Sequence, residues 1–340
     1  MTTIFEQEIR SQGELLRRRE EAGMAQAVVC AEAFDHVSHL VVAARGSSDN
    51  AAIFFQYLVG QEVGLLVALA ATSLYESGRI GLEGAGVLVI SQSGRSPGML
   101  DVVLQANEQG RPAVVITNDA SSPLAVASVH VIDLAAGPER AIASSKTFST
   151  TYHALAQLTA ALKAAPLDGL DTLPDVVDRV ATWALATNLP IDLLDATGGL
   201  TVVGRGIGFA VASEVSLKIR EVTGIRSEAF SAADYLHGPS GADGTSSTLL
   251  LVLTEELTDD IAVGVTDSCR AMGMKTVVLR SRDRPGCECD AEIIIDETLA
   301  NWSLGLAQVV VGQVLALRIG ERRGRPIDTS PGLSKVTLTA

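Results

Sequence analysis

The chain has 340 residues, of which 47% are hydrophobic but only 4% aromatic, and its formal net charge is −14. This length has room for two ordinary domains, and cores of Ala, Val, Leu and Ile suit parallel strands covered by helices on both faces. The negative charge argues against a general affinity for nucleic acid, because such affinity needs Lys and Arg against the phosphates. A small anionic ligand stays compatible with it, since a single pocket can be locally positive.

The N-terminus and the cysteines exclude further classes. Residues 1–19 are charged and lack an apolar core segment, so they do not resemble a signal peptide. We find no stretch of about twenty apolar residues, so the sequence predicts no membrane-spanning helix. We expect a cytoplasmic protein with no membrane partner. Cys30, Cys269, Cys287 and Cys289 are too few and too scattered for a disulfide framework or a zinc site. We interpret them as unpaired structural thiols.

The predicted elements alternate between helices and short buried strands. Residues 1–24 predict a charged leading helix, and stretches long enough for helices, such as 99–109 and 261–272, separate the apolar runs that follow. The apolar runs begin at Leu40, Val87, Val114 and Ile132, and again at Leu200, Leu250, Val277 and Ile295. Strands that alternate with helices predict parallel sheets with right-handed crossovers.

The same runs reveal an internal duplication. Three pairs are each displaced by 163 positions: Val87 with Leu250, Val114 with Val277, and Ile132 with Ile295. Equal offsets are not expected of two unrelated α/β domains that merely share apolar runs. The predicted fold is therefore α/β, with two tandem doubly wound parallel-sheet lobes of flavodoxin-like, three-layer αβα type and a C-terminal tail. The expected boundaries are a helix at 1–24, a first lobe at 25–166, a linker at 167–184, a second lobe at 185–324 and a tail at 325–340.

Hydroxyl-rich loops follow three expected strand ends in the first lobe, at residues 45–48, 91–96 and 143–146. Open α/β sheets bind ligands at the carboxyl ends of their strands, where helix N-termini present their amides. Phosphate prefers several short donors with little steric bulk, which Ser side chains and Gly-flanked amides supply. The corresponding loops of the second lobe, 205–208 and 254–258, contain fewer hydroxyls and two carboxylates. Only the first lobe is predicted to bind phosphate.

Groups able to move protons lie in the second half of the chain. Glu214, Lys218 and Glu221 are spaced i, i+4 and i+7, which places them on one helix face. Such a stripe is either a solvated set of salt bridges or part of a functional site. His237 precedes Gly-Pro on a predicted turn, where it could titrate near neutrality. Lys335 near the C-terminus is either a solubilising lysine or a functional one.

These features together resemble the SIS (sugar isomerase) family, and in particular the isomerase half of glutamine–fructose-6-phosphate aminotransferase. The resemblance runs from about residue 25 to the C-terminus. It rests on six motifs that occur in order at similar spacing: Arg45-Gly-Ser-Ser48, Ser91-Gln-Ser-Gly94, Ala143-Ser-Ser-Lys146, Glu214 with Lys218 and Glu221, His237-Gly-Pro239, and Leu333-Ser-Lys335.

The resemblance implies a sugar-phosphate substrate and assigns roles by position. It places the phosphate and the sugar hydroxyls on Ser48, Ser91, Gln92, Ser93 and Ser96, and it places Ile142 and Ser144 along the sugar. Glu221 corresponds to the base that moves a proton between C1 and C2. Lys218 corresponds to a lysine that assists at the sugar oxygens, and Lys335 to one that forms a Schiff base with the open-chain ketose. His237 corresponds to a ring-opening histidine contributed by the neighbouring subunit, so a homodimer is implied, and no metal or redox cofactor is needed.

Two departures from the aminotransferase pattern shape the expected function. We expect a chain without the glutaminase domain, and Arg95 and Ser96 replace the Glu and Thr typical of the synthase. The second difference resembles stand-alone SIS-type glucosamine-6-phosphate deaminases. The predicted reaction is therefore glucosamine 6-phosphate plus water giving fructose 6-phosphate and ammonia.

Other functions stay open. The alternatives within the family are a fructosamine-phosphate deglycase, a galactosamine-6-phosphate isomerase and an ammonia-dependent glucosamine-6-phosphate synthase. A non-catalytic sugar-phosphate sensor would bind the same ligand class, but it would need none of Glu221, His237 and Lys335. The residues do not distinguish gluco from galacto substrates, nor the physiological direction.

Overall fold

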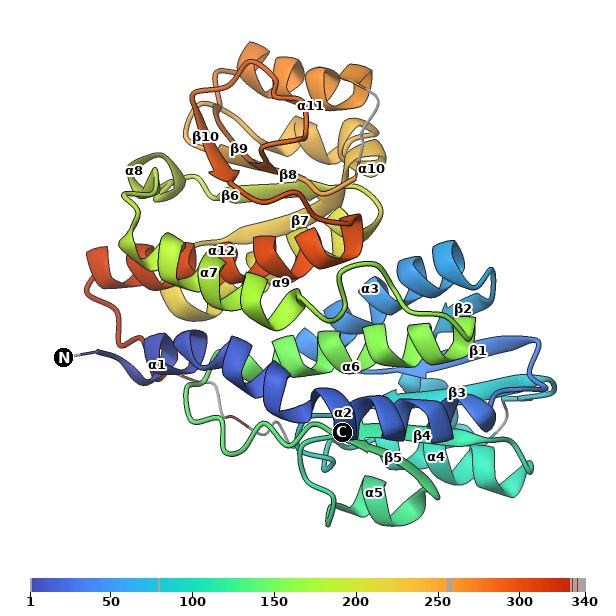
Figure 1. Ribbon diagram of the computed structural model, residues 1–340. Coiled ribbons are helices and arrows are strands. Elements are labelled where there is room, and N and C mark those ends of the chain that lie inside the picture. The colour runs from blue at the N-terminus through green and yellow to red at the C-terminus, as the bar shows by residue number, and fades with distance from the viewer. Residues whose placement is uncertain (1, 79, 256–258, 331, 333–334, 336–340) are drawn as a thin grey trace. The chain divides into compact units, whose positions relative to one another are not determined.

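The computed structural model describes residues 2–78, 80–255, 259–330, 332 and 335, with only the backbone of 259 and 260. Within these residues the strands form two parallel five-stranded sheets, with orders β2-β1-β3-β4-β5 and β10-β9-β8-β6-β7 (Figure 1). Both orders are the flavodoxin-like order 2-1-3-4-5, read in opposite directions. The predicted fold of two tandem doubly wound αβα lobes is confirmed.

The first lobe follows two N-terminal helices, α1 (Ile4–Arg10) and α2 (Gln12–Glu32). Its strands are short apolar runs, and every residue of the central strand β3 is buried, as expected for a strand covered on both faces. Its elements are β1 (His39–Ala43), α3 (Ser47–Glu62), β2 (Leu66–Leu69), η1 (Thr72–Ser77), β3 (Ala85–Ile90), α4 (Met99–Glu108), β4 (Ala113–Thr117), α5 (Pro123–Ala127), β5 (His130–Asp133) and α6 (Lys146–Lys163).

Two helical layers enclose the first sheet. Helices α3 and α6 pack together on one face, whereas α4, α5 and η1 lie on the other (Figure 1). The core under α4 consists of small and branched residues such as Val87, Val89, Val103 and Ala106. This composition agrees with the low aromatic content of the chain.

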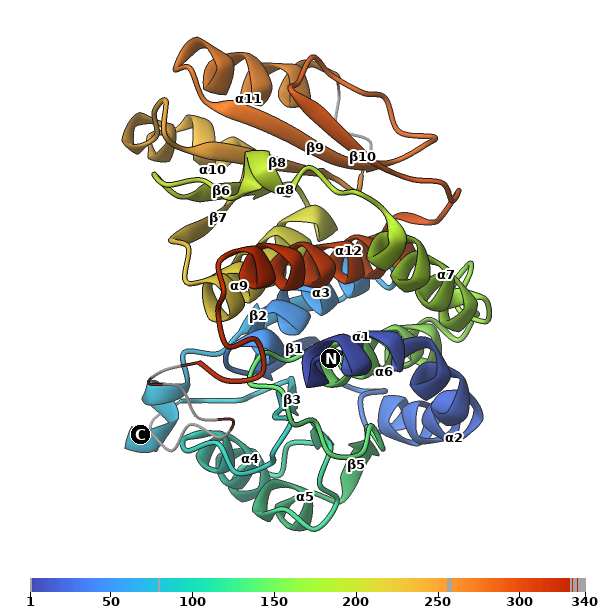
Figure 2. The same cartoon turned by 90° about the vertical axis from the view of Figure 1, so that its left-hand side faces the viewer.

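The second lobe repeats this arrangement. Its sheet carries α9 and α12 on one face and α10 and α11 on the other (Figure 2). Its elements are α7 (Leu173–Ala186), α8 (Ile191–Leu194), β6 (Leu200–Gly204), α9 (Ile207–Thr223), β7 (Ser227–Ser231), α10 (Ala232–Leu236), η2 (Pro239–Ala242), β8 (Thr248–Leu253), α11 (Asp259–Ala271), β9 (Lys275–Ser281), β10 (Ala291–Ile295) and α12 (Asn301–Arg322).

The chain does not divide into compact units at a single point. One unit is drawn from Met1–Gly13, Arg140–Ser145 and Asp171–Gly332, and the other from Glu14–Glu139, Lys146–Leu170 and Leu333–Ala340. The range 167–184, expected as a linker, contains most of α7, which packs against α12. Parts of the expected tail (331, 333, 334 and 336–340) and of the loop after β8 (256–258) lie outside the described residues. The boundaries expected from the sequence therefore remain predictions.

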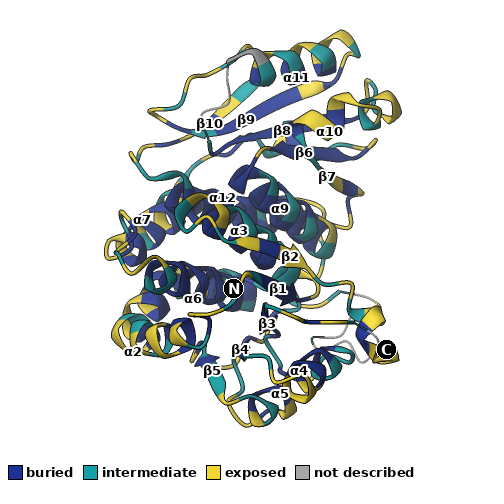
Figure 3. Cartoon of the chain, turned by 90° about the vertical axis from the view of Figure 1, so that its right-hand side faces the viewer, coloured by how far each residue is buried: buried dark blue, intermediate teal, exposed yellow. Residues whose placement is uncertain are grey.

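Helix α12 is long and apolar enough to cross a membrane by length and composition alone. In the structure 94% of its most apolar window is buried inside the protein, and Figure 3 shows the helix almost entirely in the colour of buried residues. This is how the core helix of a folded domain looks. The sequence-based expectation of no such stretch was too strict, because a helix buried on all sides is as apolar as a membrane helix.

The four cysteines carry free thiols, as expected from the sequence. Cys30 and Cys269 are buried in the cores, whereas Cys287 and Cys289 are half-buried. Burial raises the pKa of the Cys30 thiol to about 11. Thiols with a raised pKa are weak nucleophiles, so a structural role fits them.

A buried histidine on α6 links the stability of the first lobe to pH. The His153 side chain is fully buried, and its two ring nitrogens have no hydrogen-bond partner within the described residues. Burial, with a smaller contribution from the Arg19 charge, lowers the pKa of His153 to about 3. The imidazole is therefore neutral in the folded protein at all ordinary pH values.

We expect the free energy of unfolding to fall as the pH drops below about 6.5, the ordinary pKa of histidine. The unfolded chain then binds a proton that folded His153 does not accept until about pH 3. Between pH 7 and pH 5 the loss from this residue is about 2 kcal/mol. Urea unfolding of the wild type and of His153→Leu at both pH values tests it. Equal pH dependence in the two proteins would contradict the assignment.

Candidate functional site

The order in which strands are added to the first sheet reverses between β1 and β3, which are parallel, hydrogen-bonded neighbours. Helix α3 after β1 and helix α4 after β3 cover opposite faces of the sheet (Figure 1), so the loops that follow these two strands lie at its carboxyl edge where the strand order reverses. Ligands of open α/β sheets bind at this kind of switch point. Residues 45–48 and 91–96, the first two hydroxyl-rich loops, lie in these two connections.

The loop after β1 opens directly into helix α3. Gly46 is its N-terminal cap, with φ 61° and ψ −133°, a conformation that disfavours side chains. Within the described residues, a Cβ at Gly46 would meet nothing within 4 Å, so there is room beside this capping position. Ser47 and Ser48 form the first turn and are half-buried. First-turn amides and hydroxyls of this kind suit an anion.

The loop after β3 is a tight turn of hydroxyls. Ser91 is nearly buried, and its Oγ lies 3.1 Å from the Oγ of Ser96. The turn closes when the Gly94 amide donates to the Ser91 carbonyl at 3.0 Å. Gly94 has φ 60°, and a Cβ there would lie 2.0 Å from the Ser122 Oγ, so only glycine fits. Gln92 is held through its carbonyl, which accepts from the Asn118 amide at 3.0 Å.

Ser93 and Arg95 belong to the same turn. The Ser93 Oγ accepts from the Arg95 amide at 3.3 Å, and the Arg95 guanidinium pairs with Asp119 at 2.9 Å. The Arg95 side chain is exposed and that of Asp119 half-buried, and ion pairs near the surface contribute little to stability. The structure thus brings Ser91, Gln92, Ser93 and Ser96 together on one loop, with Ser48 in the first turn of α3 after the neighbouring strand β1.

The second lobe fills the corresponding place with its own carboxylate. Gly206 caps α9 with φ 57° and ψ −128°, nearly the geometry of Gly46. Here the Glu255 carboxylate accepts from the Ile207 amide at 3.0 Å, and both its oxygens lie 2.2 Å from where a Cβ of Gly206 would stand. The N-terminus of α9 therefore already holds a negative charge, and a negative charge at a helix N-terminus is stabilised by the helix dipole. A phosphate at this position would be repelled by the Glu255 carboxylate.

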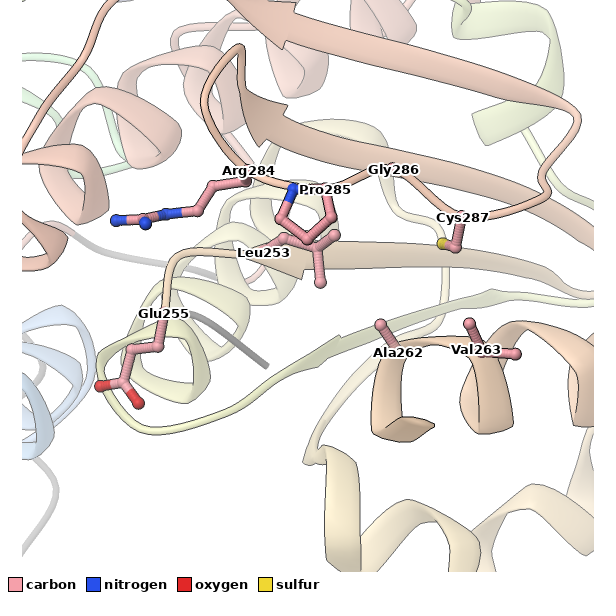
Figure 4. A pocket seen from close by; sticks show the side chains of 8 residues that line it. All are labelled: Leu253, Glu255, Ala262, Val263, Arg284, Pro285, Gly286 and Cys287. Carbon is pink, nitrogen blue, oxygen red and sulfur yellow. The ribbon is translucent and has the colours of Figure 1, made fainter. Parts of the chain in front are cut away.

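The pocket beside Glu255 is small and mainly apolar. It lies at the end of β8, and its lining includes Leu253, Ala262, Val263 and Pro285. Figure 4 shows Glu255 and Arg284 at one end and Cys287 at the other. The Arg284 guanidinium is engaged with Asn301 at 2.6 Å. The described residues that line this pocket carry no hydroxyl group for a phosphate.

The two capping glycines offer a matched test of this difference. We expect Gly206→Ala to destabilise the protein more than Gly46→Ala. Both introduce backbone strain of about 1–3 kcal/mol, but only the first drives a methyl group into the Glu255 carboxylate. Urea unfolding curves of the two variants measure the difference. Equal losses would show that Glu255 does not hold the α9 N-terminus in solution.

Helix α9 carries a buried cluster of charges. Lys218 and Glu214 are fully buried, and the Lys218 Nζ lies 3.5 Å from Glu214 and 2.5 Å from Glu221. The side chain of Glu221 stays 21% exposed. Of the two sequence interpretations, the solvated salt-bridge stripe is therefore wrong. Helical spacing correctly placed the three side chains on one face, but it could not show that this face points inward. The cluster presents one accessible carboxylate beside a buried ammonium.

Ile142 and Ser144 are held by segments far away in sequence. The Ile142 amide donates to the Asp328 carbonyl at 3.1 Å, and Glu8 accepts from the amides of Arg140 and Ala141. Asp328 in turn caps α1 by accepting from the Ile4 and Phe5 amides. The strap 140–145 is thus fixed to α1 and to the segment after α12. Both Ile142 and Ser144 are half-buried.

Lys335 forms an ion pair with a carboxylate that sequence reasoning missed. Its Nζ lies 2.7 Å from the Glu139 Oε2, and the Glu139 side chain is completely buried. Glu139 also accepts from the Thr147 amide at 3.0 Å and from the Thr147 Oγ1 at 2.6 Å, at the start of α6. Burial alone would raise the pKa of Glu139, but the Lys335 charge and these hydrogen bonds hold it below its ordinary value.

His237 sits exposed on the turn between α10 and η2. The two sides of this turn are tied together, because the Tyr235 hydroxyl donates to Asp243 at 2.9 Å and Thr201 on β6 donates to the same carboxylate. Tyr235 is fully buried. These hydrogen bonds hold the backbone on both sides of His237 in place, and the His237 side chain is exposed.

The sequence-predicted residues fall into two sets. Ser48, Ser91, Gln92, Ser93, Ser96 and Lys335 belong to one unit, and Ile142, Ser144, Lys218, Glu221 and His237 belong to the other. Glu139, Glu8 and Asp243 were missed. Their partners are distant in sequence or sit on irregular segments, so no periodic pattern pointed to them. The proline and glycine before Glu139 marked only a turn.

Comparisons with known proteins agree with this geometry. Residues 34–161 match the model of the SIS domain. The glutamine–fructose-6-phosphate aminotransferase (isomerizing) of Halobacterium salinarum is 28% identical over 323 residues, which cover 89% of this chain and 52% of that protein. The chain therefore spans about half the length of such curated relatives.

Solved structures match over nearly the whole chain. A protein provisionally described as a phosphosugar isomerase, from Silicibacter pomeroyi, has 27% identity and a TM-score of 0.83, covering 96% of this chain and 99% of its own. A glucosamine-6-phosphate deaminase from Thermotoga maritima has a TM-score of 0.80 at 19% identity, covering 99% and 100%, and so supports the fold alone. With its hydroxyl loops at the switch point, the chain matches a SIS domain over residues 34–161 and is similar over most of its length to glutamine–fructose-6-phosphate aminotransferases.

Proposed function

We propose that this chain is an amino-sugar-phosphate deaminase and isomerase that converts glucosamine 6-phosphate and water into fructose 6-phosphate and ammonia. The observation that carries the proposal is the charge cluster on α9, where the partly exposed Glu221 carboxylate lies 2.5 Å from the buried Lys218 ammonium. A positioned carboxylate is what proton transfer between adjacent carbons requires. We place the reaction in the cytoplasm.

The chemistry follows from one proton transfer and one hydrolysis. In the open-chain aldose, Glu221 removes the proton from C2 and returns it to C1, so that the C2 amine becomes an imine. Water adds to this imine, ammonia leaves, and C2 becomes the carbonyl carbon of fructose 6-phosphate. Lys218 stabilises the Glu221 carboxylate and the negative charge that develops on the sugar oxygens.

The remaining roles divide between binding and ring opening. We propose that Ser48, Ser91, Gln92, Ser93 and Ser96 hold the phosphate and sugar hydroxyls, and that Ile142 and Ser144 contact the sugar. The room beside the capping Gly46, where no described atom lies within 4 Å of a Cβ, supports the phosphate assignment, and the Glu255 carboxylate disfavours the equivalent place in the second lobe. His237 opens the sugar ring, and Lys335 forms a Schiff base with the ketose.

The deciding experiment incubates the purified protein with glucosamine 6-phosphate and follows ammonia and fructose 6-phosphate together. Equal release of both supports the deaminase. Isomerisation of galactosamine 6-phosphate, or cleavage of a fructosamine phosphate without activity on glucosamine 6-phosphate, would assign one of those reactions instead. Binding of glucosamine 6-phosphate with no turnover of any of them would indicate a sensor.

We further propose a homodimer in which each His237 serves the partner's site. Glu221→Gln and His237→Ala should each be inactive alone, yet mixing them under conditions that exchange subunits should restore up to about a quarter of wild-type activity, since half of the dimers are mixed and each has one intact site. No recovery from exchanged dimers would place His237 in the site of its own chain.

A further inference from the structure

The ion pair between Glu139 and Lys335 joins a buried carboxylate to a partly exposed lysine. Glu139 has no exposed side-chain surface, whereas the Lys335 side chain is 26% exposed and reaches it from the C-terminal segment. Thr147 holds the carboxylate in place from the start of α6 through its amide and its hydroxyl. The nearby Lys146 is directed elsewhere, since its Nζ donates to the Pro138 carbonyl at 2.7 Å. Of these two lysines, Lys335 is therefore the one that forms the ion pair with Glu139.

A lysine ammonium cannot attack a carbonyl carbon, because its nitrogen has no free electron pair. The proton on Lys335 must leave before a Schiff base forms, and the Glu139 Oε2 lies 2.7 Å from the nitrogen that carries it. If the proton went to bulk water, the fully buried Glu139 carboxylate would lose the positive charge of Lys335 that lies 2.7 Å away, which is strongly unfavourable. Burial is also the largest influence on the pKa of Glu139 and acts to raise it, whereas the Lys335 charge is the largest of the influences that lower it.

We propose that Glu139 is the acid–base partner of Lys335, accepting its proton before the ketose is attacked and returning that proton to the departing oxygen. This inference rests on the proposed function, in which Lys335 forms the Schiff base.

The steps balance in atoms and charge. Glu139 accepts a proton from the Lys335 ammonium, and the neutral amine attacks C2 of the open-chain ketose to give a carbinolamine. The carboxylic acid then protonates the carbinolamine hydroxyl, the C–O bond breaks and water leaves. The product is a protonated imine at Lys335 beside an ionised Glu139, so the original ion pair is restored with the sugar attached.

The test uses fructose 6-phosphate with sodium borohydride, which reduces the imine and leaves the sugar on the lysine. Mass spectrometry of the digested full-length chain then reports how fast Lys335 is labelled. In the wild type we expect a labelling rate that changes little between pH 6.5 and pH 9. In Glu139→Gln we expect a rate about 10²-fold lower at pH 7, rising with pH as the ammonium loses its proton to solvent.

Matched variants separate this role from a structural one. Thr147→Val keeps the carboxylate and should keep the flat pH profile, and Glu139→Asp should do so at a lower rate, which keeps the test decisive if Glu139→Gln does not fold. Lys335→Gln should not be labelled. A Glu139→Gln protein with the wild-type rate and profile, or a Glu139→Asp protein with a rising profile, would overturn the proposal while leaving the proposed function standing. A wild type labelled at no lysine, or at another one, would overturn the proposed role of Lys335 and this inference with it.

Discussion

Replacing Glu221 by Gln is expected to lower the turnover of glucosamine 6-phosphate by about 10²–10⁴-fold, the usual contribution of a general base. Glutamine keeps the size of the side chain and can still accept a hydrogen bond from Lys218, which now lies 2.5 Å from Glu221. It cannot accept a proton from C2. The loss should therefore appear in kcat, whereas binding of the sugar phosphate stays close to that of the wild type.

The measurement is steady-state release of fructose 6-phosphate, together with calorimetric titration of the variant with glucosamine 6-phosphate. Glu228→Gln is the control, because Glu228 is an exposed carboxylate on β7 of the same lobe. Its kcat should equal that of the wild type. A Glu221→Gln enzyme that retains wild-type turnover would show that another group moves the proton.

Replacing Lys218 by Met is expected to lower the free energy of unfolding by about 3–5 kcal/mol. Lys218 and Glu214 are both fully buried, so replacing Lys218 takes the positive charge of its ammonium away from a carboxylate in the core. The neighbouring Glu221 then adds a second negative charge to the same helix face. Methionine has nearly the length of lysine, so little of the loss should come from an empty cavity.

Urea unfolding followed by circular dichroism measures this loss. Lys275→Met is the matched control in the same unit, because Lys275 pairs with Asp290 but its side chain is 57% exposed. That variant should lose no more than about 1 kcal/mol. Adding Glu214→Gln to Lys218→Met should recover part of the stability, because the buried charge is then removed. Similar losses in the two lysine variants would argue that the α9 cluster is hydrated in solution.

Much of the fold could be predicted because it depends on local patterns. The runs beginning at Val87 and Leu250 are apolar at every position, which only a strand buried on both faces tolerates, and they became β3 and β8. The equal offsets between such runs predicted two similar lobes, and both sheets have the same strand order. The hydroxyl loops could also be anticipated, since the carboxyl edge of a parallel sheet collects whatever follows its strands.

Burial of charge could not be anticipated in the same way. Spacing alone predicted that Glu214, Lys218 and Glu221 share a face of α9, and it left open whether this face meets water. The packing of α9 against α12 and the sheet decided that. An amphipathic pattern would normally signal the inward face, but here the inward face itself carries charge.

The sequence by itself determined the element order, the duplicated lobe and the two loops at the switch point of the first sheet, because each depends on residues close together in the chain. Only the tertiary structure decided which charges meet. Glu139 and Lys335 are 196 positions apart, and Glu255 reaches the start of α9 from 48 positions away. No periodicity links such residues, since the contacts exist only after the sheets and helices have brought distant segments together. The second lobe consequently places its own carboxylate at the N-terminus of α9, whereas within the described residues no atom lies within 4 Å of a Cβ built on the capping Gly46 of α3.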